Sequence, residues 1–219
     1  MTKRASAIME RLYGTDVYAG FVPTFSADLQ GWNSQHPSFR DIIGSIRPDT
    51  VLDVGVWKGA STIFLANLLR ENGIDGAVIG IDTFLGSPDQ SDRNTNEYSL
   101  IPRQFGRPLL FEQFMANVIH CKAKDIVVPL AQSTDNAAEL LRRADIRAGL
   151  IHIDAAHDYA SVLRDSRQYW TLLTPGGYLI GDDYHPTWPG VVKAADEFSA
   201  EIGIPIEVRL PKWIVRKPA

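Results

Sequence analysis

The sequence has little cysteine, no long apolar run and no surplus of positive charge, and each absence excludes a class of protein. Cys121 is the only cysteine among 219 residues, which excludes an internal disulfide and a cysteine-rich zinc site. We therefore expect a reducing, cytoplasmic location. No stretch is apolar for long enough to span a bilayer, so no membrane association is expected. The charged N-terminus MTKRASAIMERLYG lacks the apolar segment of a signal peptide.

The formal net charge is −4, so the chain has no basic surplus with which to bind a phosphate backbone, and nucleic acid is not an expected partner. What is present is an ordinary globular composition, 45% hydrophobic and 22% charged, at a length that suits one domain. Residues 1–37 are expected to form an N-terminal leader, with a short helix followed by an irregular segment. Residues 38–219 are expected to form the main domain, and assembly into a homo-oligomer stays open.

Short runs of β-branched and apolar residues alternate with helical stretches from Thr50 onward. The predicted strands cover 50–54, 77–81, 125–130, 150–154 and 178–181. Such alternation implies helical crossovers and a mostly parallel sheet covered on both faces. Two further runs, at 206–209 and 213–215, are separated by too few residues for a helical crossover and predict a C-terminal antiparallel hairpin. The predicted fold is α/β, a Rossmann-like, doubly wound and mostly parallel seven-stranded sheet.

Glycines and carboxylates follow the first two predicted strands, at the edge where open α/β sheets bind ligands. The loop DVGVWKG contains Gly55 and Gly59, which suit a tight turn and a close approach of the backbone to a ligand. Asp82 ends the next strand and can accept both hydroxyls of a ribose. The loop lacks the full G-x-G-x-x-G pattern, which favours S-adenosylmethionine, a molecule without a pyrophosphate, over a nicotinamide cofactor. A plain strand-to-helix turn is the alternative interpretation of the two glycines.

A second group of carboxylates follows the fourth and fifth predicted strands. Asp154 ends the fourth strand, and the adjacent pair Asp182 and Asp183 follows the fifth. Neighbouring strands lie about 5 Å apart, so Asp154 and at least one of the pair can converge on one ion. Carboxylates without cysteine favour a hard cation, Mg²⁺ or Ca²⁺, over zinc. Helix capping is the alternative role for any single aspartate, but it explains the adjacent pair poorly.

Histidines accompany these carboxylates. His157 lies three residues after Asp154 and can act as a general base near neutral pH. His185 follows the acidic pair and is a competing candidate, with a surface role as the alternative for either residue. His152 lies within a strand run and is expected either in the core or facing a helix. Lys58, in the glycine loop, either neutralises a carboxylate or remains solvated.

Four segments together resemble a known family. LDVGVWKGAS, GIDTFLGSPD, IHIDAAHDY and LLTPGGYLIGDDY are similar to segments of the metal-dependent sugar O-methyltransferases of antibiotic biosynthesis, such as the macrocin, mycinamicin and noviose enzymes. They also resemble the wider group described as class I methyltransferase 24 or cephalosporin-hydroxylase-like. The resemblance covers roughly residues 50–198. It implies transfer of a methyl group from S-adenosylmethionine to a hydroxyl of a small molecule, a sugar or another vicinal diol.

The resemblance also implies roles for single residues. Gly55 and its neighbours would hold the methionine part of the donor, Asp82 the ribose, and Phe84 and Ser133 would lie near the adenine. The full set implied to contact the donor is Asp53, Gly55, Gly59, Ser61, Asp82, Thr83, Phe84, Ser133 and Asp154. Asp154, Asp182 and Asp183 would ligate Mg²⁺. His157 and Asp154 would be the catalytic residues, with His157 as the base. The related sugar enzymes often have glutamate where this chain has Asp53.

Residues 87–107 form a long polar segment that leaves the same edge of the predicted sheet. Long segments of this kind in a compact domain are usually functional lids or disordered. Two other functional classes stay open at this point. One is an NAD-dependent oxidoreductase on a similar fold, and the other is a non-catalytic protein that binds S-adenosylmethionine or metal. A catechol, which also presents two neighbouring oxygens to a metal, is an alternative acceptor.

Overall fold

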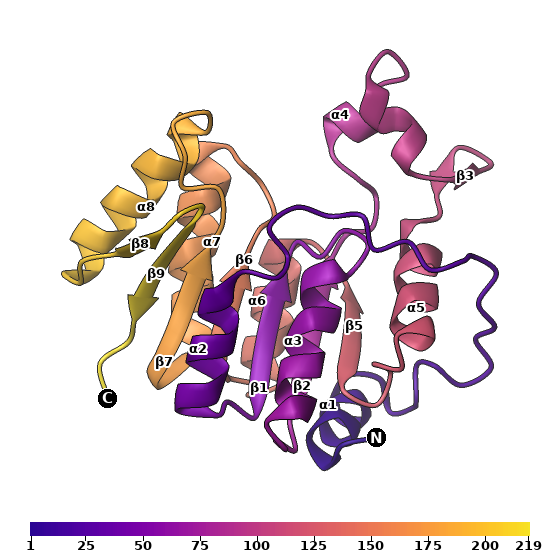
Figure 1. Ribbon diagram of the computed structural model, residues 1–219, viewed down its shortest axis with the longest axis horizontal. Helices are drawn as coiled ribbons and strands as arrows, with labels where there is room; N and C mark the ends of the chain where they lie inside the picture. Colours follow the sequence, from indigo (N-terminus) through magenta and orange to yellow (C-terminus); the bar gives the residue numbers. More distant parts are fainter.

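The computed structural model describes residues 1–219 and is built around a seven-stranded sheet (Figure 1). The strand order is β5-β2-β1-β6-β7-β9-β8. The strands are β1 (Thr50–Val54), β2 (Ala77–Asp82), β5 (Val127–Ala131), β6 (Ala148–Ile153), β7 (Leu173–Gly181), β8 (Glu207–Arg209) and β9 (Lys212–Arg216). The first five strands in this order are parallel, whereas β9 runs antiparallel to both β7 and β8. The predicted fold, with its C-terminal antiparallel hairpin, is confirmed.

Helices cover both faces of the sheet. In Figure 1, α2 and α3 lie in front of the strands, and α6 and α7 lie behind them. The helices are α1 (Lys3–Tyr13), α2 (Pro37–Ile46), α3 (Ala60–Glu71), α5 (Leu110–His120), α6 (Thr134–Arg143), α7 (Tyr159–Leu172) and α8 (Pro189–Ile202). None of the helices combines the length and apolar character that a membrane span requires.

The central strands are buried on both faces, which is why their sequences are apolar throughout instead of alternating. All five residues of β1 are buried, and so are the last four of β6. Asp53 in β1 and His152 in β6 interrupt these apolar runs. The parallel register places Asp53 directly beside His152, so these two buried polar residues meet each other.

Two regions contain more secondary structure than the sequence indicated. The helix α2 begins at Pro37, a favourable residue for a first turn, and His36 caps it by accepting the N–H of Ser38. Residues 87–107, expected to be a lid or disordered, include the short helices α4 (Pro88–Ser91) and η1 (Asn96–Leu100). A small hairpin of β3 (Arg103–Gln104) and β4 (Arg107–Pro108) ends this insert. The insert projects beyond the carboxyl ends of the strands (Figure 1).

The direction in which successive strands are added reverses at β1. The chain passes from β1 outward to β2 and β5 and then returns to β6 on the other side of β1. Such a reversal opens a crevice at the carboxyl ends of the two strands, the usual ligand-binding position of this architecture. The glycine loop after β1 and Asp154 after β6 both lie there.

Candidate active site

The two glycines of the loop after β1 are required by the backbone around them. Gly55 has a φ of +85°, and a Cβ at this position would lie 2.0 Å from the carbonyl oxygen of Asp154. Gly59 has a φ of +89°, and its Cβ would lie 2.8 Å from the ring of Phe114. Both conformations are costly for other residues, so the tight turn predicted from the sequence is confirmed. The loop therefore lies directly against the end of β6.

Asp82 fastens the glycine loop to the end of β2. Its Oδ2 accepts the backbone N–H groups of Val56 and Trp57, each at 3.0 Å, and its Oδ1 accepts the N–H of Phe84 at 2.8 Å. Burial raises the pKa of Asp82, and these backbone hydrogen bonds oppose the rise. A carboxylate has about four acceptor positions. Oδ1 thus keeps acceptor capacity for a hydroxyl of a bound molecule.

Asp53 and Ser61, both in the predicted donor-binding set, lie behind the loop and bond to each other. Asp53 is fully buried, and its Oδ2 accepts the hydroxyls of Ser61 at 2.8 Å and Thr62 at 2.5 Å. Its Oδ1 accepts Nδ1–H of His152 at 2.7 Å. Both oxygens are therefore used within the protein. These contacts join the end of β1 to the first turn of α3 and to β6.

Three other members of the predicted set have partners of their own. The ring of Phe84 is buried and packs against Phe111 and Phe114, with centroids 5.0 and 5.2 Å away, so it belongs to the core. The exposed Thr83 accepts the N–H of Leu85. Ser133 begins α6, with its hydroxyl accepting the N–H of Asn136. Of these three side chains, that of Thr83 is exposed and that of Ser133 is half-buried, so only these two keep part of their surface free.

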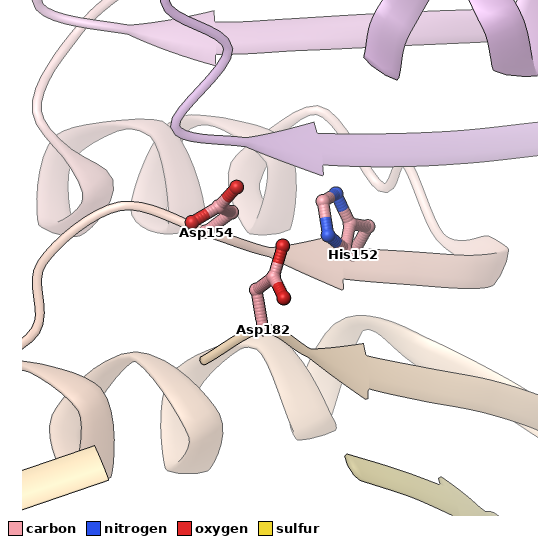
Figure 2. A group of neighbouring side chains, drawn as sticks. All are labelled: His152, Asp154 and Asp182. Atoms are coloured by element: carbon pink, nitrogen blue, oxygen red, sulfur yellow. The ribbon is translucent and has the colours of Figure 1, made fainter. Parts of the chain in front are cut away.

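The carboxylates after β6 and β7 converge as predicted. Figure 2 shows Asp154, Asp182 and His152 gathered at the carboxyl ends of β6 and β7. One ligand atom from each of these three residues lies within 4.8 Å of the other two. Asp154, His157 and Asp183 form a second group that meets the same limit. Asp154 belongs to both groups and links them, whereas no group within this limit contains all three predicted metal ligands.

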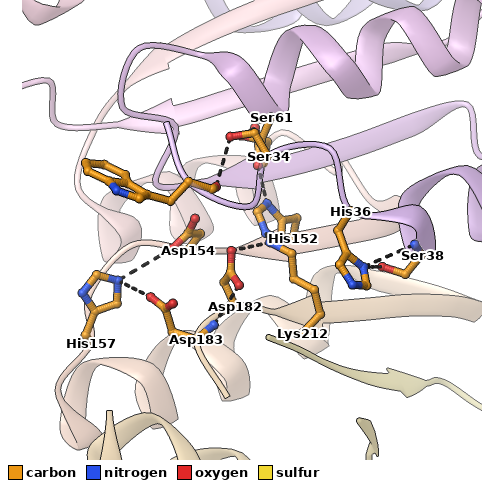
Figure 3. A network of polar contacts seen from close by, with 12 residues as sticks. Ser34, His36, Ser38, Ser61, His152, Asp154, His157, Asp182, Asp183 and Lys212 are labelled. Atoms are coloured by element: carbon orange, nitrogen blue, oxygen red, sulfur yellow. Dashed lines mark hydrogen bonds and ion pairs between the residues drawn. The ribbon is translucent and has the colours of Figure 1, made fainter. Parts of the chain in front are cut away.

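His157 bonds to this cluster and lies against an aromatic ring. Its Nε2 lies 3.0 Å from Asp183 Oδ2 and 3.7 Å from Asp154 Oδ1 (Figure 3). The carboxylates of Asp154 and Asp183 raise the pKa of His157 to about 10. The ring of Trp188 stacks on it with a centroid distance of 4.4 Å. His185, the competing candidate, is exposed and bonds to Thr187 instead.

Sequence reasoning missed Lys212, the first residue of β9. Its ammonium is fully buried, forms an ion pair with Asp182 and lies 3.1 Å from Nε2 of His152 (Figure 3). A lysine that opens the apolar run KWIV was the available signal, because lysine is almost never buried without a partner. Lys58 also has a partner, Asp28, at 2.6 Å, and is buried rather than solvated.

The two carboxylates at the centre of the cluster differ in acidity. Burial and the charge of Asp154 raise the pKa of Asp182 to about 6, although Lys212 opposes the rise. Burial alone would also raise the pKa of Asp154, but hydrogen bonding with His157 and the surrounding positive charge lower it below its usual range. The cluster thus concentrates negative charge that the chain balances with Lys212 and His157.

The donor set fits a hard divalent cation. Asp154, Asp182 and Asp183 offer only oxygen, the donor that Mg²⁺ and Ca²⁺ prefer. His152 is close enough to be a ligand, but Asp53 and Lys212 occupy its two ring nitrogens. A site made of oxygens, with a protonatable imidazole beside it, is suited to activating a hydroxyl group.

A crevice at the carboxyl ends of a reversed parallel sheet is the usual ligand-binding position of the open α/β class, and comparisons identify the family. A family model described as a methyltransferase domain matches residues 52–184, more than half of the chain. The chain belongs to this methyltransferase family. This result decides against the NAD-dependent oxidoreductase that the sequence left open.

Solved structures share the whole fold. An O-methyltransferase from Bacillus cereus, solved in complex with SAH, has a TM-score of 0.58 and 15% identity, covering 96% of this chain and 91% of that one. CalS11, a TDP-rhamnose 3'-O-methyltransferase of calicheamicin biosynthesis, has a TM-score of 0.57 and 16% identity, covering 97% and 92%. The fold is therefore that of the class I S-adenosylmethionine-dependent O-methyltransferases.

A curated sequence relative is an uncharacterised protein of Acanthamoeba polyphaga mimivirus, 24% identical over 160 residues. The match covers 70% of this chain and 60% of the relative.

Proposed function

We propose that this chain transfers a methyl group from S-adenosylmethionine to a hydroxyl of a small molecule, assisted by a divalent cation. The observation that carries the proposal is the pair of acidic groups that share Asp154 at one edge of the sheet, one with Asp182 and His152 and the other with Asp183 and His157. Carboxylate oxygens are the donors that hard cations prefer. An adjacent imidazole supplies the proton acceptor that a hydroxyl nucleophile needs.

The donor would bind in the crevice above β1 and β2. The loop of Gly55 and Gly59 allows close approach of the backbone, and Asp82 keeps an acceptor position on Oδ1 for a ribose hydroxyl. When bound, S-adenosylmethionine supplies an already activated methyl group, so the protein contributes mainly orientation. Asp53 and Ser61 support that orientation from behind, because they fix the end of β1 to the start of α3.

Asp154, Asp182 and Asp183 would hold the cation. When bound there, a divalent cation would lower the pKa of the acceptor hydroxyl and orient two neighbouring oxygens. An acceptor with vicinal oxygens, such as a sugar or another diol, suits this chemistry. The sugar nucleotide acceptor of CalS11 is consistent with that class. Trp188, exposed on one side and stacked on His157, offers an apolar surface on which a sugar ring can pack.

His157 would remove the hydroxyl proton. With Asp154 and Asp183 as its partners, its pKa of about 10 keeps the imidazole protonated at neutral pH. The same two carboxylates belong to the proposed cation-binding set, so they serve either the imidazolium or the cation. Carboxylates that bind the cation no longer stabilise the imidazolium of His157. Cation binding would therefore favour the neutral imidazole, the form that can accept a proton.

The substitution Asp154→Asn tests the proposal. We expect turnover to fall by about 100-fold, because a carboxylate ligand is lost, while the Kd for S-adenosylhomocysteine in calorimetry changes little. The matched control is Asp145→Asn, at an exposed position with a φ of +49° that asparagine also tolerates. Full activity of Asp154→Asn, or of the unsubstituted enzyme in EDTA, would remove the cation from the mechanism.

A further inference from the structure

The strand β8 forms one outer edge of the seven-stranded sheet. It pairs with β9 on one side, and no strand lies beyond it on the other (Figure 1). All three of its residues, Glu207–Arg209, are exposed, and so is Leu210 after it. Successive residues of a strand direct their backbone groups to alternate sides, so some N–H and C=O groups of β8 point away from β9. These groups form a template on which a further strand can be added.

The sequence around β8 is symmetric about Val208. From Pro205 to Pro211 the chain reads PIEVRLP. Apolar residues occupy positions 206, 208 and 210, and the two charged residues, Glu207 and Arg209, lie on either side of Val208 with opposite signs. A proline ends the segment on each side, and proline has no N–H to donate to a neighbouring strand. The segment is therefore complementary to a reversed copy of itself.

The pairing with β9 shows to which face of the sheet these side chains belong. Residues directly opposite each other in an antiparallel pair share a face. Val208 lies opposite Trp213, whose ring packs against Phe198 of α8 at a centroid distance of 6.3 Å. Arg209, the next residue, lies on the opposite face and donates to Asp41 of α2 at 2.9 Å. The edge thus has an apolar face toward α8 and a charged face toward α2.

A second copy of this chain fits the edge when the two β8 strands run antiparallel with their Val208 residues opposite each other. In this register Glu207 of each copy lies opposite Arg209 of the other, and Ile206 lies opposite Leu210. Opposite charges on directly opposed residues stabilise a sheet, whereas like charges destabilise it. A shift of one residue would place charged side chains beside apolar ones, so the pattern specifies a single register.

We propose that two copies of this chain associate through β8, antiparallel and centred on Val208, which joins their sheets into one. The association covers Val208 and Leu210, which are 43% and 63% exposed in the single chain. Five residues pair on each side, so the interface is small and the dimer is weak, with a Kd of about 10 to 100 μM. The interface contains none of the residues proposed to bind the donor or the cation.

Charge reversal tests this pairing. Glu207→Arg places like charges opposite each other at two symmetric positions, and Arg209→Glu does the same with the other sign. In sedimentation equilibrium, the dimer Kd of each variant alone should rise by about tenfold or more. An equimolar mixture restores both opposite-charge pairs, because one copy then has two positive side chains and the other has two negative ones. The mixture should therefore associate with a Kd close to that of the unsubstituted protein.

The matched control is Glu71→Arg, at the end of α3. Glu71 is 52% exposed and paired with Arg40, much as Glu207 is 56% exposed and paired with Arg209. The control carries the same charge reversal away from the edge, so its dimer Kd should equal that of the unsubstituted protein. All three substituted side chains are exposed, and circular dichroism should show the same fold in every variant.

Each outcome supports or overturns the proposal. Recovery of the dimer in the mixture, after its loss in each variant alone, would support the antiparallel pairing. An unsubstituted protein that remains monomeric at about 1 mM would overturn the proposal. A dimer that neither reversal weakens would place the interface elsewhere and overturn it as well. Two weakened variants that fail to associate when mixed would contradict the pairing of Glu207 with Arg209.

Discussion

At the scale of single residues, the site balances its negative charge with two cations of different kinds. Lys212 is buried and permanently paired with Asp182. His157 is partly exposed, and its charge depends on protonation. One cation is thus fixed by the fold, and the other depends on the ligands and the pH.

The pKa of His157 can be measured in the metal-free protein. By nuclear magnetic resonance in EDTA, its imidazole should titrate near pH 10, because Asp154 and Asp183 stabilise the protonated form. Asp183→Asn should lower that pKa, since it removes the partner at 3.0 Å. The variant His157→Gln identifies the resonance by its loss. A pKa close to the ordinary 6.5 in both proteins would contradict the geometry.

Asp165 in α7 predicts a pH-dependent stability. Its side chain is 2% exposed, and burial raises its pKa from 3.8 to about 6. The protonated form is favoured in the folded state, so the stability it contributes is present below pH 4 and lost as the pH rises through 6. Asp165→Asn avoids this loss. Relative to the unsubstituted protein, the free energy of unfolding of Asp165→Asn should rise by about 2 kcal/mol as the pH increases from 4 to 8, as measured by urea denaturation.

Asp158 provides a control of opposite sign. The N–H of Ser161 lowers the pKa of this exposed carboxylate, which caps α7. A lowered pKa contributes stability above the unfolded value that is lost as the pH falls. The disadvantage of Asp158→Asn should therefore shrink toward pH 4. If the stability of Asp165→Asn and of Asp158→Asn, each relative to the unsubstituted protein, changed with pH in the same direction, burial would not control the titration of Asp165.

At the scale of elements, the loop between β1 and α3 depends on the end of β6. Gly55→Ala places a methyl group 2.0 Å from the carbonyl oxygen of Asp154 at a positive φ. We expect a loss of about 3 kcal/mol in the free energy of unfolding and loss of S-adenosylhomocysteine binding. Gly73→Ala, with a φ of +61° and no atom nearby, should cost only about 1 kcal/mol and leave binding unchanged. If the two substitutions changed thermal unfolding and S-adenosylhomocysteine binding in calorimetry to the same extent, the special requirement for Gly55 would be contradicted.

The sequence was sufficient to predict those elements whose pattern is local. Asp154, Asp182 and Asp183 follow apolar strands, and parallel strands bring their carboxyl ends to one edge, so their convergence was predictable. Lys212 was not, because β9 runs antiparallel to β7. Its first residue therefore lies beside the last residues of β7, which sequence separation does not reveal. The packing of Phe84 against Phe111 and Phe114 likewise depends on how α5 is oriented.

At the scale of the whole molecule, the insert of residues 87–107 is largely self-contained. Arg103 donates to the carbonyls of Tyr98 and Ile101 within it, and Ser87 and Gln90 form a capping box at its start. Phe105, at the tip of its hairpin, is 98% exposed. Ile101 is the one residue of the insert that belongs to the buried core, so the insert adds surface above the site and little else to the seven-stranded body.

Replacing residues 87–107 by a flexible Gly-Ser linker should therefore preserve the body. We expect circular dichroism close to that of the full chain, a Tm within a few degrees, and a similar Kd for S-adenosylhomocysteine. Loss of folding would mean that the insert contributes to the core, and loss of donor binding alone would place it in the donor site.

The position of Lys212 on the last strand has a consequence for how the enzyme matures on the ribosome. β9 is synthesised after every strand that bears a carboxylate of the cluster, and Asp182 meets its ammonium partner only when that strand has been added to the sheet. A nascent chain that has already paired β1, β2, β5, β6 and β7 therefore presents an acidic edge whose Asp182 still lacks its ammonium partner. The ion pair between Lys212 and Asp182 therefore forms only after every strand that carries a carboxylate of the cluster has been made.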